Sequence, residues 1–294
     1  MATVYEIITD RIIAAIETDG TLPWHKPWRA GTAAPANLKS GKAYRGINVF
    51  LLGMLGYSSP YFVSYKQAKT LGGQVRKGEK GSPVVFWLWP DEKKKAAAAA
   101  KGKQAFPIMR YYTVFNVSQC DGISHKRLTE WQAAEDAAAG QTHDAIESAA
   151  AIAAGWEDGC KVEHGKSQAY YSPSADAIGM PNLDAFETAP AYYCTLFHEM
   201  VHATGHSSRL DRFPADSGAQ PFGSESYSQE ELTAEMGASF LAAEGGLPLD
   251  SFIDQSAAYV ANWLQRLKGD SKLVVTAAAR AQKAADLVLG RTFE

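Results

Sequence analysis

The sequence predicts an α+β protein of two domains: a small basic α+β domain, then a mostly helical domain with a small sheet. Its 294 residues suffice for two domains of ordinary size. Residues 1–120 carry 17 Lys and Arg against 7 Asp and Glu, whereas the remainder carries 12 against 25. The first half combines helical spacing with strand-like runs, whereas helical spacing prevails in the second. We place the domains at 1–125 and 142–294, joined by a polar, Ala-rich linker at 126–141.

In the first half, apolar residues at helical spacing predict an amphipathic helix that ends near Asp19, before Gly20. A Pro- and Gly-rich basic segment follows, which we expect to be irregular. Two helices at 47–55 and 64–71 and two strands at 84–89 and 108–117 complete the domain. Between the strands, residues 91–103 form either a mobile hairpin tip or a short exposed Ala-rich helix.

In the second half, we expect a strand-like stretch at 169–180. It is either the edge strand along which a peptide substrate lies or an ordinary interior strand. Helical patterns occupy the rest of this half, at residues 145–154, 190–204, 228–243, 251–267 and 273–289.

Composition excludes several classes of protein. Apolar residues make up 46% and charged residues 21%, as in a globular protein. Cys120, Cys160 and Cys194 are too few and too far apart for a disulfide framework. The start of the chain lacks a signal-peptide pattern, and its most apolar run, 47–57, is too short to span a bilayer. We therefore expect a cytoplasmic protein without a membrane partner.

The clearest chemical signal is an HExxH motif at residues 198–202. Residues four apart lie on one face of a helix, so the imidazoles of His198 and His202 can reach one ion. Glu199 points about 100° away around the helix, which suits a carboxylate beside a metal-bound water. Two neutral imidazoles and an open position are typical of catalytic zinc.

The third ligand has to come from elsewhere in the chain. We predict Glu231, on the acidic helix at 228–243, whose small residues allow close packing against the motif helix. Glu235, four residues on, is assigned to hydrogen-bond the outer nitrogen of a liganding histidine. Alternatively, Glu231 and Glu235 exchange these roles, or Glu230 is used instead. These alternatives stay open because spacing alone does not determine which face of the helix points toward the metal.

Three further side chains have candidate roles near the motif. Tyr227 and His206 are candidates for stabilising an oxyanion, and His206 becomes an alternative ligand if Gly205 ends the helix. Cys194 is interpreted as a small buried apolar side chain rather than a ligand.

Several segments resemble ArdC-type antirestriction proteins of conjugative plasmids. HEMVHATGH, preceded by AYYSPSADAIGMP and followed by SQEELTAEMGASFL, resembles their zincin-like metallopeptidase domain. YRGINVFLL, SYKQAKTLGGQVRKGEKGSPVVFW and RYYTVFNVSQC resemble their N-terminal domain, which binds single-stranded DNA and also occurs in plasmid primases.

The resemblance implies a zinc-dependent, gluzincin-like peptidase site that uses Zn²⁺ or another divalent metal such as Mn²⁺. His198, His202 and Glu231 would be its ligands and Glu199 its catalytic carboxylate. It further implies protection of incoming conjugative DNA from host restriction, with a restriction-system protein as a candidate substrate. The alternative is a non-catalytic protector that binds single-stranded DNA and whose metal site is structural. A primase or nuclease accessory is less favoured, because no carboxylate cluster suited to two Mg²⁺ ions accompanies the basic half.

Binding of single-stranded DNA requires cations that follow phosphates and flat rings on which bases stack. The basic segment offers both. We interpret Phe62, Phe86 and Trp87 as core residues, and Trp24 and Trp28 as stacking residues. The predicted DNA contacts are Trp24, Lys26, Trp28, Arg29, Lys42, Tyr44, Arg45, Lys66, Lys69, Arg76, Lys77 and Lys80.

Overall fold

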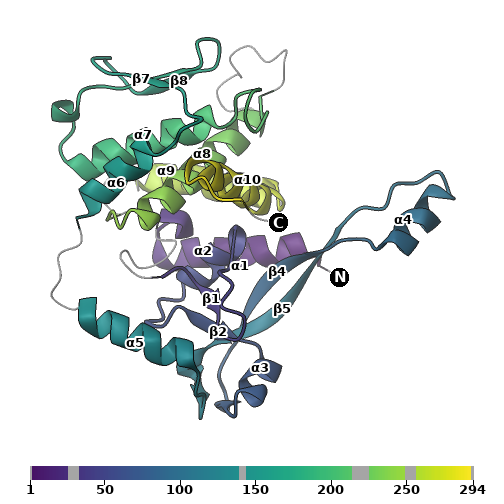
Figure 1. The fold of residues 1–294 in the computed structure, drawn as a ribbon. Coiled ribbons are helices and arrows are strands. Elements are labelled where there is room, and N and C mark those ends of the chain that lie inside the picture. Colours follow the sequence, from purple (N-terminus) through teal and green to yellow (C-terminus); the bar gives the residue numbers. More distant parts are fainter. Residues whose placement is uncertain (1, 26–32, 139–143, 214–224, 249–255, 293–294) are drawn as a thin grey trace.

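The computed structural model describes residues 2–25, 33–138, 144–213, 225–248 and 256–292 (Figure 1). It confirms an α+β protein of two domains with small sheets. Among the described residues, none of the helices has the length and apolar character needed to cross a membrane.

The first domain is built around a four-stranded sheet in the order β1-β2-β5-β4, in which only the β1–β2 pair is parallel. A second, two-stranded sheet joins β3 and β6. The helices are α1 (Val4–Asp19), α2 (Ile47–Gly53), α3 (Tyr65–Thr70) and α4 (Glu92–Ala99), with short 3₁₀ turns η1 (Pro23–His25) and η2 (Val117–Gln119). The strands are β1 (Ala36–Asn37), β2 (Tyr61–Val63), β3 (Gln74–Val75), β4 (Ser82–Leu88), β5 (Ile108–Asn116) and β6 (Cys120–Asp121).

Local chemistry explains where the first helix begins and ends. Thr3 and Glu6 form a capping box, which satisfies two backbone N–H groups at the start of α1. Gly20 follows the helix with a φ of 68°, a left-handed conformation that glycine adopts without steric cost. The predicted end near Asp19 is therefore confirmed.

The second domain is mostly helical, and it carries a three-stranded sheet in the order β7-β9-β8. Its helices are α6 (Ala145–Ala154), α7 (Ala189–Ala203), α8 (Glu225–Glu244), α9 (Ala257–Gly269) and α10 (Leu273–Val288), with one 3₁₀ turn, η3 (Leu183–Ala185). The strands are β7 (Lys161–Glu163), β8 (Tyr170–Ser172) and β9 (Ala177–Gly179).

The structure refines the predictions for three segments. Residues 126–138, within the segment predicted as a linker, form helix α5 (Lys126–Ala138). Residues 92–99 adopt the helical alternative rather than an unstructured tip. Residues 169–180 form a hairpin instead of one strand: β8 lies at the edge of the sheet and β9 in the middle.

One hydrophobic core spans both domains, and two smaller clusters lie within the first. Helices α1 and α2 lie against the helices of the second domain (Figure 1), and the ring of Phe50 in α2 stacks on Phe240 in α8 with 4.8 Å between centroids. Helix α8 packs between α7 and α10 at the centre of this core. The first domain is thus anchored directly to the helix that carries the predicted third ligand.

Candidate metal centre and nucleic-acid surface

Helix α7 presents the HExxH motif to helix α8. Thr188 caps the start of α7 through its hydroxyl, and Pro190 occupies the first turn, where a missing N–H costs nothing. Close packing of the two helices depends on Gly237, because a Cβ there would lie 2.7 Å from Val201 Cγ2. The small residue predicted to allow this approach does so.

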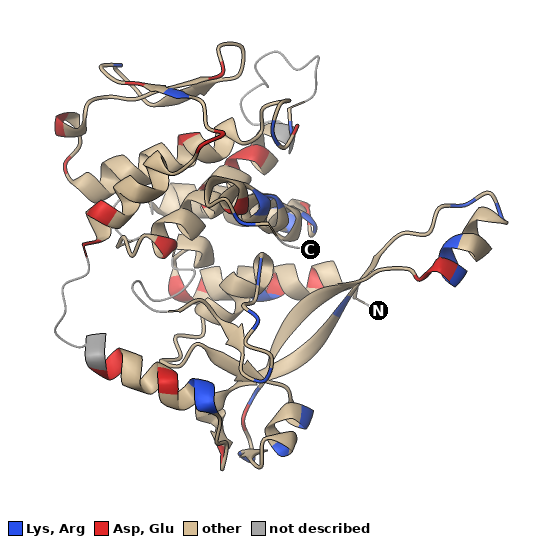
Figure 2. Ribbon diagram, viewed as in Figure 1, with Lys and Arg blue, Asp and Glu red and all other residues tan. Residues whose placement is uncertain are grey.

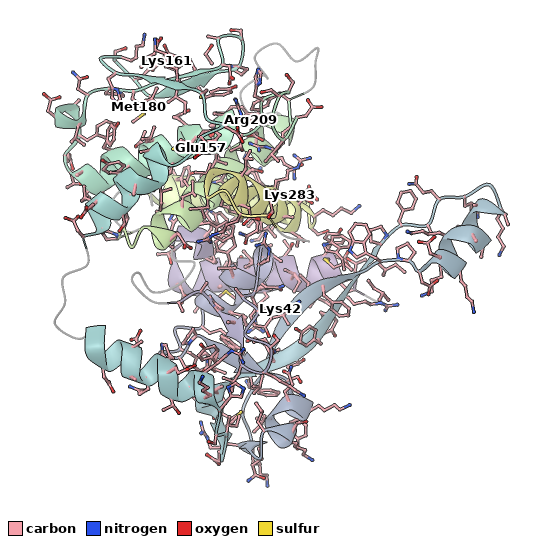
Figure 3. All side chains as sticks on the ribbon, viewed as in Figure 1. Lys42, Glu157, Lys161, Met180, Arg209 and Lys283 are labelled. Carbon is pink, nitrogen blue, oxygen red and sulfur yellow. The ribbon has the colours of Figure 1, made fainter. Side chains whose placement is uncertain are left out.

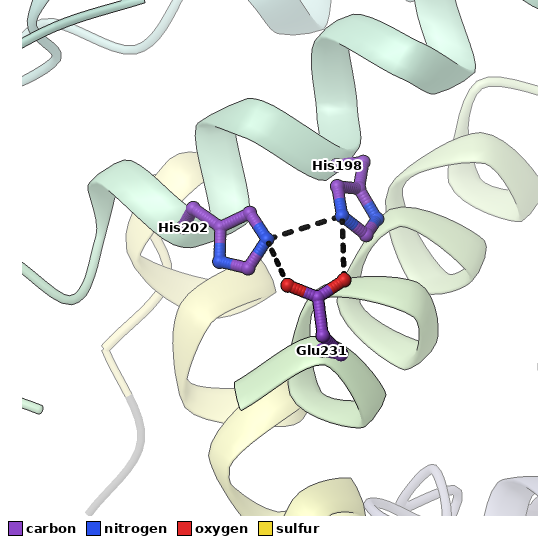
Figure 4. Close-up of side chains that lie close together, drawn as sticks. All are labelled: His198, His202 and Glu231. Carbon is purple, nitrogen blue, oxygen red and sulfur yellow. Dashed lines mark hydrogen bonds and ion pairs between the residues drawn. The ribbon is translucent and has the colours of Figure 1, made fainter. Parts of the chain in front are cut away.

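Three side chains converge in the arrangement that the sequence predicts (Figure 4). His198 and His202 bring their Nε2 atoms within 3.1 Å of each other. Glu231 Oε2 lies 3.8 Å from His198 Nε2, and its Oε1 lies 3.5 Å from His202 Nε2. Ligands at about 2.0–2.2 Å around a tetrahedral ion are separated by about 3.3 Å, so these donors fit one divalent ion. Among the described residues, they are the one such His, Cys, Asp and Glu cluster.

The outer nitrogen of His202 is held by Glu230, not by Glu235. His202 Nδ1 lies 3.3 Å from Glu230 Oε1, and Arg212 donates hydrogen bonds of 2.7 and 3.0 Å to the same carboxylate. A protonated Nδ1 leaves the lone pair of Nε2 facing the metal position. The prediction of Glu235 for this role was wrong, and the alternative left open for Glu230 is the observed one.

The surroundings set the charge states of the two histidines and Glu230. Burial lowers the pKa of His198 to about 3, which keeps its imidazole neutral. Burial would also lower the pKa of His202, but the hydrogen bond to Glu230 and the nearby carboxylates raise it. Glu230 is partly buried too, yet its hydrogen bonds to His202 and Arg212 hold its pKa below the ordinary value.

Glu199 lies beside the cluster and not in it, as expected. Its side chain is buried, with 9% of the residue exposed, and the backbone of Tyr171 in the edge strand β8 acts on its carboxylate in the direction that lowers the pKa. Burial, reinforced by the charge of Glu231, raises the pKa of Glu199. The catalytic candidate is therefore held against the strand predicted to align substrate.

The other side chains near the motif have different surroundings. Tyr227 hydrogen-bonds the Glu231 carboxylate through its hydroxyl. His206 contacts Ser208 and lies 3.9 Å from Asp176, outside the ligand cluster. Cys194 is buried, which raises the pKa of its thiol and agrees with its interpretation as a core side chain.

Glu235 and Trp24 contact each other in the core. Neither therefore has its predicted role, which was to support a liganding histidine for Glu235 and to stack on DNA bases for Trp24. Trp24 is fully buried and donates its indole N–H to Glu235 over 2.9 Å, and Tyr259 donates its hydroxyl to the same carboxylate. A ring with no exposed surface cannot stack on a base, so the prediction of Trp24 as a DNA contact was wrong. In the core, the ring of Trp24 is removed from water and its N–H has an acceptor. This stabilisation decides its position, although the neighbouring residues in the sequence are basic.

The remaining predicted DNA contacts divide into four groups. Lys26, Trp28 and Arg29 lie outside the described residues. Tyr44 packs edge-on against Phe62, and Arg45 is paired with Asp286, so both are partly buried. Arg76 is exposed but pairs with Glu79 and Asp121. Among the described residues, the exposed cations of this set that have no carboxylate within 4.0 Å are Lys42 (labelled in Figure 3), Lys66, Lys69, Lys77 and Lys80.

Two aromatic residues expected in the core are exposed. Phe62 is buried as predicted, but Phe86 and Trp87 are each 42% exposed on the β4–β5 hairpin. The hairpin extends beyond the domain that covers its base (Figure 1), so apolar spacing in these strands did not indicate burial.

Two residues that contribute to the site, Arg212 and Tyr171, were not predicted from the sequence. Arg212 follows the motif by ten residues at no characteristic spacing, and Tyr171 acts through its backbone, which no side-chain pattern reveals. Their roles depend on how the chain folds back over α7.

The fold and the site together define a metallopeptidase-like protein with a zincin-like domain. Residues 148–280 match the family model described as zincin-like metallopeptidase, and residues 2–115 match the N-terminal domain of anti-restriction factor ArdC. The chain belongs to the ArdC antirestriction family.

Relatives and solved structures agree with that membership. The crystal structure of the antirestriction ArdC protein from plasmid R388 with bound Mn(II) is 41% identical, with a TM-score of 0.74 and 98% of each chain covered. The metal-free structure of the same protein gives 40% and 0.72, with 97% of this chain and 96% of that one covered. The Sinorhizobium fredii protein y4eC is 38% identical over 96% of this chain and 90% of its own length. An Escherichia coli DNA primase TraC is 38% identical over 97% of this chain, which spans only 27% of the primase.

Proposed function

We propose that this protein protects incoming plasmid DNA from restriction in the cytoplasm of the recipient cell, where it binds single-stranded DNA and hydrolyses peptide bonds at a divalent-metal site. The observation that carries the peptidase proposal is the cluster of His198, His202 and Glu231 with Glu199 beside it. Membership in the ArdC family supports the antirestriction role.

The chain's own residues suit hydrolysis. A divalent ion held by His198, His202 and Glu231 would act as a Lewis acid that polarises a carbonyl and acidifies water. Glu199 is placed to accept a proton at its carboxylate and return it to a leaving amine, and burial brings its pKa closer to neutrality. The edge strand β8 supports an extended peptide by backbone hydrogen bonds.

The donor set accommodates more than one metal. Two imidazoles and a carboxylate are ordinary zinc ligands, and the Mn(II)-bound R388 structure supports manganese as well. We propose zinc as the principal metal and Mn²⁺ as an alternative. A host restriction-system protein is the proposed peptidase substrate.

The proposal is tested with Glu199→Gln, which keeps size and shape and removes the proton acceptor. We expect metal content equal to that of the unaltered protein, loss of peptide hydrolysis and loss of protection of conjugated DNA in a restricting recipient. Glu157→Gln, an exposed residue labelled in Figure 3, is the matched control. Hydrolysis at the normal rate by Glu199→Gln would refute the assignment.

The same experiment separates a second candidate function. The exposed cations of the first domain support a protein that protects DNA by occupying it, with a structural metal. In that case Glu199→Gln would protect DNA fully, whereas charge-neutral variants of Lys66, Lys69 and Lys77 would not.

A further inference from the structure

We infer that residues 86–112, here termed the arm, form a surface on which single-stranded DNA stacks. The arm comprises the outer parts of β4 and β5 with α4 at its tip, and it projects away from both domains (Figure 1). This inference rests on the proposed function, because it locates the DNA contact and does not establish that one exists.

The arm concentrates exposed apolar side chains. Of the 11 large hydrophobic residues exposed among the described part of the chain, eight lie here. Trp89 is 71% exposed and Phe106 68%, values far above those of a packed core. Such a concentration marks an interaction surface. The eight residues are Phe86, Trp87, Leu88, Trp89, Phe106, Ile108, Tyr111 and Tyr112.

The strand register places aromatic rings on both faces of the arm. Phe86 pairs with Arg110 and Val84 with Tyr112, so Phe86, Arg110 and Tyr112 share one face, where the two rings meet edge-on at 5.8 Å. Trp87 pairs with Met109 and Val85 with Tyr111, which puts Trp87 and Tyr111 on the opposite face. A flexible strand can wrap both faces of a thin ribbon, whereas a rigid protein partner covers one.

The charge of the arm complements a phosphate backbone. Its tip and stem hold six cations against Asp91 and Glu92, and these two carboxylates are paired with Lys94 and Lys95. Within the described residues, no carboxylate lies within 4.0 Å of the remaining four, which are Lys93, Lys101, Lys103 and Arg110. Figure 2 shows Lys and Arg positions in and after α4, at the tip of the arm. Protein interfaces are depleted in lysine, so aromatic rings beside free cations favour a single nucleic-acid strand.

The first test separates stacking from hydrophobic docking. In the full-length protein, both Trp87 and Trp89 are changed to Leu in one variant and to Phe in another, and binding of a labelled oligothymidine is followed by fluorescence anisotropy. Because leucine offers no flat ring on which a base can stack and phenylalanine does, we expect the Leu variant to bind about tenfold or more weakly and the Phe variant within about threefold. Leu183→Ala, a similarly exposed residue of the other domain, is the control.

The second test concerns the cations. Lys93, Lys101 and Lys103 are changed together to Gln, and a control variant changes Lys161, Lys166 and Lys283, of which the first and last are labelled in Figure 3. Each lost phosphate contact should reduce the slope of log affinity against log salt by about 0.7, and the control should keep the slope of the unaltered protein. Metal content and far-UV circular dichroism report that each variant is folded.

The outcomes are distinguishable. If the unaltered protein binds the oligonucleotide and the Leu variant binds equally well, the arm inference is overturned while the proposed function stands. A Leu variant with full DNA affinity but altered self-association would make the arm a protein interface and overturn the inference in the same way. If the unaltered protein fails to bind at all, the DNA-binding part of the proposed function is what fails.

Discussion

The indole N–H of Trp24 hydrogen-bonds the carboxylate of Glu235 over 2.9 Å, across a sequence separation of 211 residues. Glu235 lies one helical turn after Glu231 on α8, so the start of the first domain is tied to the helix that carries a predicted metal ligand. His25, adjacent to Trp24, is also buried, and its Nε2 lies 4.0 Å from Glu235. This contact makes the two domains one structural unit around the site.

We expect Trp24→Phe to destabilise the protein without weakening DNA binding. The phenyl ring keeps much of the apolar contact but leaves Glu235 without one of its donors, which costs about 1–3 kcal/mol when the group is buried. Denaturant unfolding of metal-free protein measures the loss. Oligonucleotide affinity of the folded variant should equal that of the unaltered protein, and a large drop in affinity would restore Trp24 as a DNA contact.

Glu235 should make stability depend on pH. Burial raises its pKa to about 7, although Tyr259 and Trp24 donate hydrogen bonds that oppose the shift. Because the folded carboxyl holds its proton more tightly than the unfolded one, its ionisation reduces stability as pH rises from about 4.5 to 7, by up to about 3 kcal/mol. Burial lowers the pKa of His25 to about 4, so His25 contributes with the opposite sign over part of this range.

The contribution of Glu235 is isolated by comparison with Glu235→Gln, which keeps His25 and Trp24. Unfolding free energies of both proteins are measured from pH 4.5 to 8 in the presence of a chelator. The difference between them should grow in favour of the Gln variant as pH rises. A difference that is constant with pH would show that Glu235 has no raised pKa.

Glu230 should control metal affinity through His202. We expect Glu230→Gln to weaken metal binding about 10- to 100-fold, because the neutral amide no longer favours the Nδ1-protonated imidazole or balances Arg212. Titration with Zn²⁺ in competition with a chromophoric chelator measures the change. Glu157→Gln should bind as the unaltered protein does, and equal affinity in both variants would remove Glu230 from the site.

Gly237 should be required for the spacing of the metal helices. In Gly237→Ala, the added methyl meets Val201 Cγ2 at 2.7 Å, and valine has no flexible end that can move away. We expect overpacking to cost about 1–3 kcal/mol against a gain of about 1 kcal/mol in helix propensity, with weaker metal binding as the helices separate. Gly269→Ala, where a Cβ meets nothing within 4 Å, is the control. Tighter metal binding by Gly237→Ala would contradict this account.

The sequence alone determined the features that depend on local spacing. The HExxH turn put His198 and His202 on one face, because an α-helix repeats every 3.6 residues wherever it packs. The acidic helix offered Glu230, Glu231 and Glu235, and its packing against α7 decided that Glu231 faces the two imidazoles. Helix ends also followed local chemistry, as Gly20 shows.

Only the tertiary structure decided which faces were covered. Local sequence predicted that Trp24 is exposed and Phe86 buried, yet Trp24 is buried under α8 and α9 and Phe86 is exposed on the arm, because burial depends on what another part of the chain places over a residue. Glu230 rather than Glu235 supports His202 for the same reason. Arg212, shortly before α8 in the sequence, pairs with Glu230, whereas Trp24, near the start of the chain, donates a hydrogen bond to Glu235.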